Sequence, residues 1–280
     1  MKWSVREKTF DLERRGMVMG ILNVTPDSFS DGGSYCDDER AVEAALKMVE
    51  DGAEIIDVGG ESTRPGAAAI SPVEEMSRVL PVIEKLRSRS EVLISIDSSK
   101  ARVAEAALNA GADIINDVSG GLRDEDMMPL WARKDCGIVL MHSQGRPETM
   151  QDDPSYTDVV AEVTAFFYQQ WRKAAEQGVE VERVLFDPGI GFGKGQEHNL
   201  ALLGNLEELR AHGRPLLLGV SRKSFIARVL EDEAMNLRDW PTVALTAASY
   251  GAGCRVFRVH DVRPNVEALR MVEAIENVTD

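Results

Sequence analysis

Short runs rich in Val, Ile and Leu alternate with longer amphipathic stretches along the whole chain. This alternation is typical of repeated βα units built around a parallel sheet. The runs are nearly continuous in apolar residues, which indicates strands that are covered on both faces. They cover residues 17–24, 54–60, 92–97, 113–118, 137–142, 183–189, 215–221 and 254–260.

Helical patterns fill the segments between the runs, and several end with a glycine just past the last turn, where a positive φ angle closes a helix. These glycines are Gly52, Gly111, Gly178 and Gly213. The expected helices cover residues 37–51, 71–88, 100–110, 124–134, 156–178, 198–212, 221–230, 242–251 and 262–275. No linker rich in Pro, Gly or Ser divides the 280 residues. We therefore predict one domain over residues 1–280, an α/β fold of the (β/α)8 or TIM barrel type rather than an open doubly wound sheet.

Composition excludes several classes of function. With 32 basic and 47 acidic residues the formal net charge is −15, and such a field disfavours nucleic acid and anionic membranes as partners. The N-terminus scatters charges where a secretory signal needs an apolar stretch of roughly 7 to 15 residues. Cys36, Cys136 and Cys254 are too far apart to form a Cys-x-x-Cys pair. We expect a cytoplasmic protein without disulfides or a structural zinc site.

Polar side chains end almost every apolar run, and in a barrel of this type the chemistry lies at the carboxyl ends of the strands. A single polar residue there is most often a simple strand cap, but a series around the barrel indicates a site. The series consists of Asn23, Glu61, Ser62, Thr63, Arg64, Asp97, Asn116, Asp117, His142, Asp187, Ser221, Arg222, Lys223, Arg258 and His260.

Asp97, Asn116, Asp187 and Lys223 should meet at the barrel mouth, where they offer both donors and acceptors to a flat heterocycle such as an aminopyrimidinone. The alternative is a structural Asp–Lys ion pair, because a buried carboxylate requires a partner.

Arg64, Arg258 and His260, with Asn23, form a second set. Guanidinium groups bind phosphate oxygens, and an Asn carbonyl is a suitable ligand for Mg²⁺, so the set indicates a diphosphate site. The alternative is that these cations are solvated or paired with surface carboxylates.

Further segments limit the kinds of active site that the chain can form. The loops 25–33 and 61–67 are longer than ordinary connections and can close over a substrate. The Gly-rich segment 187–194 matches neither a P-loop nor a dinucleotide motif. Ser221 lies outside any G-x-S-x-G elbow, and its place before a helix suits a small carboxylate. His142 is interpreted as a hydrogen-bonded core residue.

Eight motifs together closely resemble the dihydropteroate synthase family of the folate pathway, over residues 17–275. In order, they are GILNVTPDSFSDGG, IIDVGGESTRPGA, SIDSSK, INDVSG, MHSQGRPETMQ, FDPGIGFGK, LLGVSRKSFI and RVFRVHDV. The chain departs from the family pattern at Ser98, where Thr is usual, and at Ser143, where Met is common.

This resemblance implies an enzyme that condenses 4-aminobenzoate with 6-hydroxymethyl-7,8-dihydropterin diphosphate, giving 7,8-dihydropteroate and pyrophosphate by a dissociative displacement. It implies Mg²⁺ as cofactor, a homodimer and sensitivity to sulfonamides. By resemblance the pterin site is Asp97, Asn116, Met141, Asp187, Phe192 and Lys223, and the diphosphate site is Asn23, Arg64, Arg258 and His260, with Asn23 on the metal. The aminobenzoate site is Phe29, Thr63, Arg64, Pro65 and Ser221, and the catalytic set is Asp97, Lys223 and Arg258.

A pterin-binding methyltransferase that acts with a corrinoid protein is the main alternative, because the same Asp and Asn residues would serve it. Its substrate has no diphosphate, so the cationic set argues against it. A barrel that only binds a pterin is the non-enzyme alternative, which measurable turnover would exclude.

Overall fold

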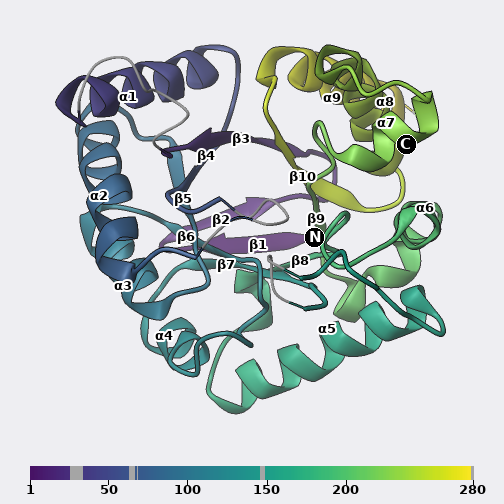
Figure 1. Ribbon diagram of the computed structural model, residues 1–280, viewed down its shortest axis with the longest axis horizontal. Helices are drawn as coiled ribbons and strands as arrows, with labels where there is room; N and C mark the ends of the chain where they lie inside the picture. The colour runs from purple at the N-terminus through teal and green to yellow at the C-terminus, as the bar shows by residue number, and fades with distance from the viewer. Residues whose placement is uncertain (26–33, 63–66, 68, 146–148, 279–280) are drawn as a thin grey trace.

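Eight parallel strands close into a barrel in the computed structural model (Figure 1), in the order β10-β3-β4-β5-β6-β7-β8-β9. The structure describes residues 1–25, 34–62, 67, 69–145 and 149–278. The barrel strands are β3 (Met17–Asn23), β4 (Ile55–Gly59), β5 (Leu93–Asp97), β6 (Ile114–Asp117), β7 (Gly137–Met141), β8 (Val184–Asp187), β9 (Leu216–Leu218) and β10 (Cys254–Val259). Each strand falls within one of the eight apolar runs, so the predicted (β/α)8 barrel is confirmed.

Helices surround the strands (Figure 1) and cover their outward apolar faces. They are α1 (Ser34–Glu50), α2 (Pro72–Arg89), α3 (Ala101–Ala110), α4 (Met127–Arg133), α5 (Val159–Glu176), α6 (Gln196–Gly204), α7 (Ser224–Leu230), α8 (Asp239–Tyr250) and α9 (Val262–Glu276). The four glycines expected to close helices all have positive φ angles, from 64° at Gly213 to 118° at Gly111. Among the described residues, no helix is both long enough and apolar enough to cross a membrane.

The single helix expected over 198–212 is wrong. The helix α6 stops at Gly204, and two short 3₁₀ helices, Leu206–Leu209 and Ala211–Gly213, follow it. Asn205 causes the break, because its Nδ2 donates to the Ala201 carbonyl at 2.8 Å while its backbone leaves the helical region. An Asn side chain that bonds to a nearby carbonyl competes with helix continuation in this way.

An antiparallel hairpin, β1 (Lys2–Val5) with β2 (Lys8–Asp11), precedes the barrel and was not predicted. Trp3, Val5 and Leu12 are buried against the apolar side chains inside the barrel. The Trp3 indole Nε1 donates to the carbonyl of Arg183, just before β8, at 3.1 Å. The hairpin therefore closes the end of the barrel where the strands begin.

The barrel interior changes from apolar to polar along the strands. Near the hairpin it is filled by side chains such as Met17, Ile114 and Val256. At the other end, the strand register aligns Asn23 with Gly59, Gly59 with Asp97, and Asp97 with Asn116. Residues in register on neighbouring strands share one face, so these side chains form one layer at the carboxyl end.

Candidate active site

Gly59 leaves a small open space between Asn23 and Asp97 at the barrel mouth. A β-carbon added there would lie 3.8 Å from Asn23 Oδ1 and 3.7 Å from Asp97 Oδ2. Both oxygens therefore lie beside the same space. Two hard oxygen atoms, from the strands on either side of β4, suit a cation or a ligand donor.

Arg258 links two buried carboxylates across the barrel. Its Nε donates to Asp57 Oδ2 at 2.6 Å, and its Nη2 donates to Asp97 Oδ2 at 2.7 Å. Asn116 Nδ2 donates to the same Asp57 oxygen at 3.1 Å. Although burial opposes the charge of Arg258, the two carboxylates raise the pKa of its guanidinium above the usual value. The cation is therefore held firmly charged inside the barrel.

Three acceptor oxygens at this site have no donor among the described residues. They are Oδ1 of Asp57, of Asp97 and of Asn116, each shielded from solvent. A buried acceptor without a donor costs about 1 to 3 kcal/mol. Because almost all buried polar groups in proteins are bonded, these oxygens indicate a ligand that brings hydrogen-bond donors.

The titratable groups of the site have strongly shifted pKa values. Burial raises the pKa of Asp97 to about 7, helped by the charge of Asp57 and opposed by Arg258. Burial also raises the pKa of Asp187, against the effect of nearby cations such as Lys223. Burial lowers the pKa of Lys223 to about 8, partly offset by Asp187. Such clusters of perturbed groups are typical of functional sites.

Asp187 and Lys223 complete the mouth from the opposite side. Asp187 Oδ1 accepts from Gly189 N at 2.7 Å, and its Oδ2 lies beside Arg258 across the open space above Gly219. Lys223 Nζ donates to the Ile190 carbonyl and lies 4.4 Å from the centre of the Phe192 ring.

Met141 pairs with Asp187 in the β7–β8 register. The structure thus brings Asp97, Asn116, Met141, Asp187, Phe192 and Lys223 to one end of the barrel. Among the described residues, Asp97 pairs with Arg258 rather than with Lys223, so the structural Asp–Lys alternative is not what the fold builds at this carboxylate.

The predicted diphosphate set is divided in the structure. Arg258 lies inside the barrel with the carboxylates, whereas His260 lies at the rim beside Ser221. Ser221 Oγ accepts from the His260 backbone N–H at 3.1 Å and lies 3.0 Å from its Nδ1. Phe29, Thr63, Arg64 and Pro65 lie outside the described residues.

Two parts of the site were missed by sequence reasoning. Asp57 was overlooked because it lies within an apolar run rather than at its end. A charged residue inside such a run was the signal that could have identified it as part of the site. The second part is the pair of partners of Glu61, a residue that the sequence placed at a strand end: Lys100 Nζ donates to Glu61 Oε1 at 3.0 Å and to buried Glu75 Oε2 at 2.5 Å. Glu61 also accepts from Ile70 N at 2.8 Å. These bonds tie Glu61 and Ile70 to the first turns of α2 and α3.

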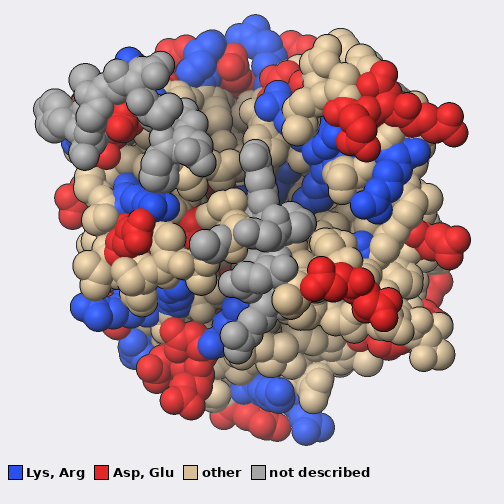
Figure 2. Space-filling model, viewed as in Figure 1, with Lys and Arg blue, Asp and Glu red and all other residues tan. Residues whose placement is uncertain are grey.

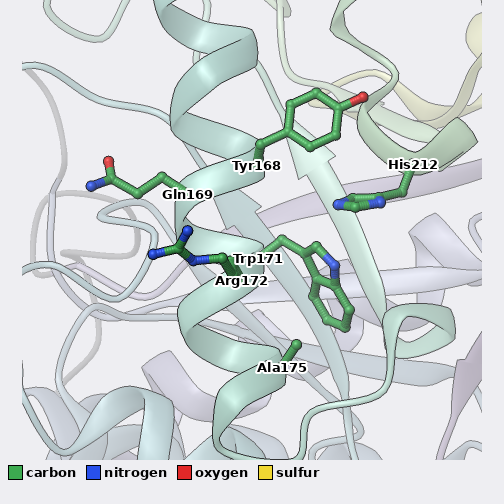
Figure 3. A pocket seen from close by; sticks show the side chains of 6 residues that line it. All are labelled: Tyr168, Gln169, Trp171, Arg172, Ala175 and His212. Carbon is green, nitrogen blue, oxygen red and sulfur yellow. The ribbon is translucent and has the colours of Figure 1, made fainter.

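A groove on α5 lies away from this cluster (Figure 3). Tyr168 and Trp171 point toward His212, and the His212 ring centre lies 4.8 Å from that of Tyr168. The groove has a volume of about 480 Å³ and is mainly apolar. His212 precedes β9, so the groove is at the end of the barrel where strands begin. It contains none of the perturbed carboxylates and is not the candidate active site.

Surface charge does not point to a second charged site on the face in view. Figure 2 shows acidic and basic side chains interspersed there, with no broad area of one sign. The net charge of −15 is therefore not concentrated on this face.

Comparisons with known proteins identify the family of this chain. Residues 19–260 match the family model described as "Pterin binding enzyme". The chain is 48% identical over 258 residues to a dihydropteroate synthase of Escherichia coli, covering 92% of this chain and 90% of the relative.

Solved structures show the same likeness. A dihydropteroate synthase from Clostridium difficile, determined in the presence of pteroic acid, is 44% identical with a TM-score of 0.89, covering 95% of this chain and 98% of the other. That of Yersinia pestis, determined with a sulfonamide drug complex, is 41% identical with a TM-score of 0.90, covering 99% and 100%.

Proposed function

The chain belongs to the pterin binding enzymes and, within them, to the dihydropteroate synthases, and from this premise we propose how its residues carry out the reaction. It condenses 4-aminobenzoate with 6-hydroxymethyl-7,8-dihydropterin diphosphate to give 7,8-dihydropteroate and pyrophosphate. The observation that supports the assignment of its residues most directly is the set of buried acceptors on Asp97 and Asn116 that lack donors.

The pterin ring is placed by complementarity of donors and acceptors. Its amino and ring N–H groups donate to Asp97, Asn116 and Asp187, while its carbonyl accepts from Lys223. Met141 and Phe192 contact the ring faces. Since the pocket is buried, a ring that lacks these donors leaves the carboxylates unbonded, and this mismatch provides specificity.

The diphosphate is assigned to the rim beside His260 and to Asn23, and Arg64 is assigned to it by resemblance to the family. Mg²⁺ fits this arrangement because Asn23 Oδ1 lies beside the open space at Gly59. The described residues contain no cluster of three or more His, Cys, Asp or Glu that could cage a metal. This agrees with an ion that keeps phosphate and water oxygens as most of its ligands. Asn23 would hold the Mg²⁺ ion, and the bound ion would offset negative charge on the diphosphate.

Bond breaking precedes bond making in this proposal. The electron pair of the C–O bond leaves with pyrophosphate, and the methylene carbon becomes cationic while conjugated with the electron-rich ring. The carboxylates of Asp97 and Asp187 stabilise that charge. The lone pair of the 4-aminobenzoate nitrogen then forms the C–N bond, and its proton passes to water. An aromatic amine is neutral at pH 7, so the step requires no general base. Ser221, with Phe29, Thr63, Arg64 and Pro65, is assigned to the aminobenzoate.

The test is product formation by purified protein. Pyrophosphate and dihydropteroate should appear in equal amounts, only when both substrates and Mg²⁺ are present. The corrinoid methyltransferase alternative would instead give methyl transfer from a methylated folate and no pyrophosphate. Absence of pyrophosphate under all these conditions would contradict the proposed reaction.

Pterin binding should weaken as the pH falls below about 7. The bonded form of Asp97 is ionised, yet the pKa of this carboxyl in the free protein is raised to about 7. A proton must therefore leave on binding, and the dissociation constant should rise by about tenfold per pH unit below that value for one proton. Fluorescence titration of a pterin between pH 5.5 and 8.5 measures this. A pH-independent affinity would contradict the role of Asp97.

Sulfonamides should compete with 4-aminobenzoate. Residues 61–67 contain no inserted residue relative to the family motif, and a relative has been determined with a sulfonamide drug. Rejecting the drug while accepting the substrate requires a repulsive feature, which the motif does not carry. The drug should raise the KM for 4-aminobenzoate and leave kcat unchanged. Full activity at a large molar excess of drug would contradict this expectation.

We propose a homodimer formed through α7, α8 and the 3₁₀ segment between them, which pack together. Apolar side chains are exposed there, and Trp240 is 76% exposed. The others are Val229, Leu230, Met235 and Leu237. Exposed apolar side chains gathered on elements that pack together are typical of a subunit interface. A cytoplasmic location is proposed with it, because Cys136 and Cys254 are free thiols.

The Trp240→Glu and Met235→Glu variants should therefore sediment as monomers, because a buried carboxylate opposes association. Val73→Glu, at an exposed apolar position on α2, is the matched control and should remain dimeric. Sedimentation velocity distinguishes the two states. A wild-type protein that is monomeric at all concentrations would contradict the proposal.

A further inference from the structure

The glycine-rich turn after β8 is held in place by side chains that donate hydrogen bonds to its backbone carbonyl oxygens. Four consecutive carbonyls, from Ile190 to Gly193, each accept a hydrogen bond from a different side chain. In order, the donors are Lys223 Nζ, Gln151 Nε2 at 2.7 Å, Lys194 Nζ at 3.0 Å and Tyr156 Oη at 2.8 Å. This is the segment that matched no phosphate-binding motif. The turn thus serves as a support that carries Phe192, rather than as a phosphate loop.

The glycines of this turn allow it to lie directly against the segment after β7. Gly189 and Gly193 both have positive φ angles, of 64° and 61°. A β-carbon added at Gly189 would lie 1.9 Å from the His142 carbonyl oxygen, and one at Gly193 would lie 2.2 Å from that of Gln144. No other residue type fits at this approach. The two segments are therefore in backbone contact.

Lys194 joins these two segments from inside. Its side chain is 1% exposed, and its ammonium has three acceptors, which match its three N–H donors. They are His142 Nδ1 at 2.9 Å, the His142 carbonyl at 3.3 Å and the Phe192 carbonyl at 3.0 Å. Within the described part of the chain, no carboxylate forms an ion pair with Lys194. Burial lowers the pKa of the Lys194 ammonium to about 7, partly offset by the charge of Asp187. Burying this amine is therefore costly, which argues for a purpose beyond packing.

His142 is the matching acceptor. Burial lowers the pKa of its ring to about 3, helped by the charge of Lys194. The ring is therefore neutral, with Nδ1 accepting from Lys194 and the proton on Nε2. Phe166 packs edge-on against it, with ring centres 4.8 Å apart. The ring is thus fixed in place, as the sequence interpretation of a hydrogen-bonded core residue expected.

We propose that Lys194 and His142 are positioning residues that set the width of the pterin slot. Met141 immediately precedes His142, and Phe192 is two residues before Lys194, so the Lys194–His142 link ties together the backbones that carry both ring contacts. This inference rests on the proposed assignment of Met141 and Phe192 to the pterin faces. A change in spacing of only 0.5 to 1 Å removes about a quarter to a half of the dispersion energy at a contact. The link therefore acts on pterin affinity through Met141 and Phe192.

The test compares variants that remove or retain the link. Lys194→Met keeps the chain length and removes the donors, and His142→Phe keeps a ring and removes the acceptor. Both should raise the dissociation constant of 6-hydroxymethylpterin, measured by calorimetry, by about 10- to 100-fold. The KM for the pterin diphosphate should rise with it, while the KM for 4-aminobenzoate changes less than twofold. His142→Asn, whose Oδ1 can replace Nδ1 as acceptor, should restore most of the affinity.

Arg183→Met is the matched control for loss of a buried cation. Arg183 lies at the opposite end of the barrel and donates to the carbonyls of Cys136 at 2.9 Å and Trp131 at 2.7 Å. This variant should lose thermal stability and keep its pterin affinity. The link is overturned if Lys194→Met binds the pterin like the wild type, or if Arg183→Met loses as much affinity.

The His142 variants and Phe192→Ala separate loss of the link from loss of folding and from loss of the slot. If Lys194→Met does not fold, the difference between His142→Phe and His142→Asn decides, and equal affinities in these two variants overturn the link. Phe192→Ala tests the slot itself. Unchanged pterin affinity in Phe192→Ala overturns the assignment of Phe192 to the pterin slot. Weaker pterin binding in Phe192→Ala, together with wild-type affinity in Lys194→Met, overturns only the role of the Lys194–His142 link.

Discussion

Asp97→Ala and Asp187→Ala should each weaken pterin binding by about a hundredfold or more, equivalent to about 2.7 kcal/mol. Each substitution leaves donors of the ring without an acceptor in a buried pocket, at about 1 to 3 kcal/mol per lost partner and more where a charge is involved. Asp97→Ala also removes the carboxylate that pairs with Arg258 Nη2 at 2.7 Å. Calorimetric titration with 6-hydroxymethylpterin measures both effects.

Asp113→Ala provides the control for this prediction. Asp113 is a carboxylate that precedes β6 at the other end of the barrel and pairs with Arg87 at 2.6 Å. Its loss should lower stability without changing pterin affinity. Wild-type affinity in both mouth variants would show that the pterin binds elsewhere.

Arg258→Met should destabilise the fold and abolish turnover. It leaves the carboxylates of Asp57, which is 0% exposed, and Asp97 without their cation. Breaking a buried pair from one side costs about 3 to 5 kcal/mol. The same charge is required beside the pterin, so the folded fraction of the variant should also lack measurable condensation activity.

The destabilisation of Arg258→Met should depend on pH in a defined direction. Arg258 lowers the pKa of Asp97, which burial has raised to about 7, so its removal raises that pKa further. A carboxyl whose pKa is higher in the folded state contributes stability at low pH and loses it as the pH rises through the folded value. Urea unfolding should therefore show a larger deficit at pH 8 than at pH 5. Equal deficits at both pH values would contradict this electrostatic account.

A second substitution separates charge from packing. Asp57→Asn in the Arg258→Met background removes one of the stranded charges and should recover part of the stability at pH 8, but no activity. Failure to recover stability would indicate that the lost packing of the Arg258 side chain, rather than charge, dominates.

The barrel and most of its mouth could be predicted because both depend on local patterns. Apolar runs specify strands, and the carboxyl ends of parallel strands must meet, so Asp97, Asn116 and Asp187 converge whatever the details of packing. The hairpin that closes the other end was not predictable in the same way. Its four-residue strands are too short to show a period, and their burial depends on the finished barrel.

Asp57 and Arg258 show where local pattern is insufficient. They are 201 residues apart in sequence, yet Arg258 Nε lies 2.6 Å from Asp57 Oδ2 in the structure. The sequence assigned Arg258 to phosphate on its chemical type alone. The residues beside Arg258 in the sequence give no sign that two carboxylates already bind it in the fold. Lys194 was missed for a related reason, since its partners are mostly backbone carbonyls, which every sequence contains and no motif marks.

The most direct test of the account is a crystal structure of the protein with 6-hydroxymethylpterin and pyrophosphate bound. The ring should lie between Met141 and Phe192, with its donors within hydrogen-bonding distance of Asp97 Oδ1, Asn116 Oδ1 and Asp187. Pyrophosphate should lie at the rim beside His260. A pterin bound in the α5 groove of Figure 3, with the three carboxyl and amide oxygens of the mouth unbonded to it, would contradict the account.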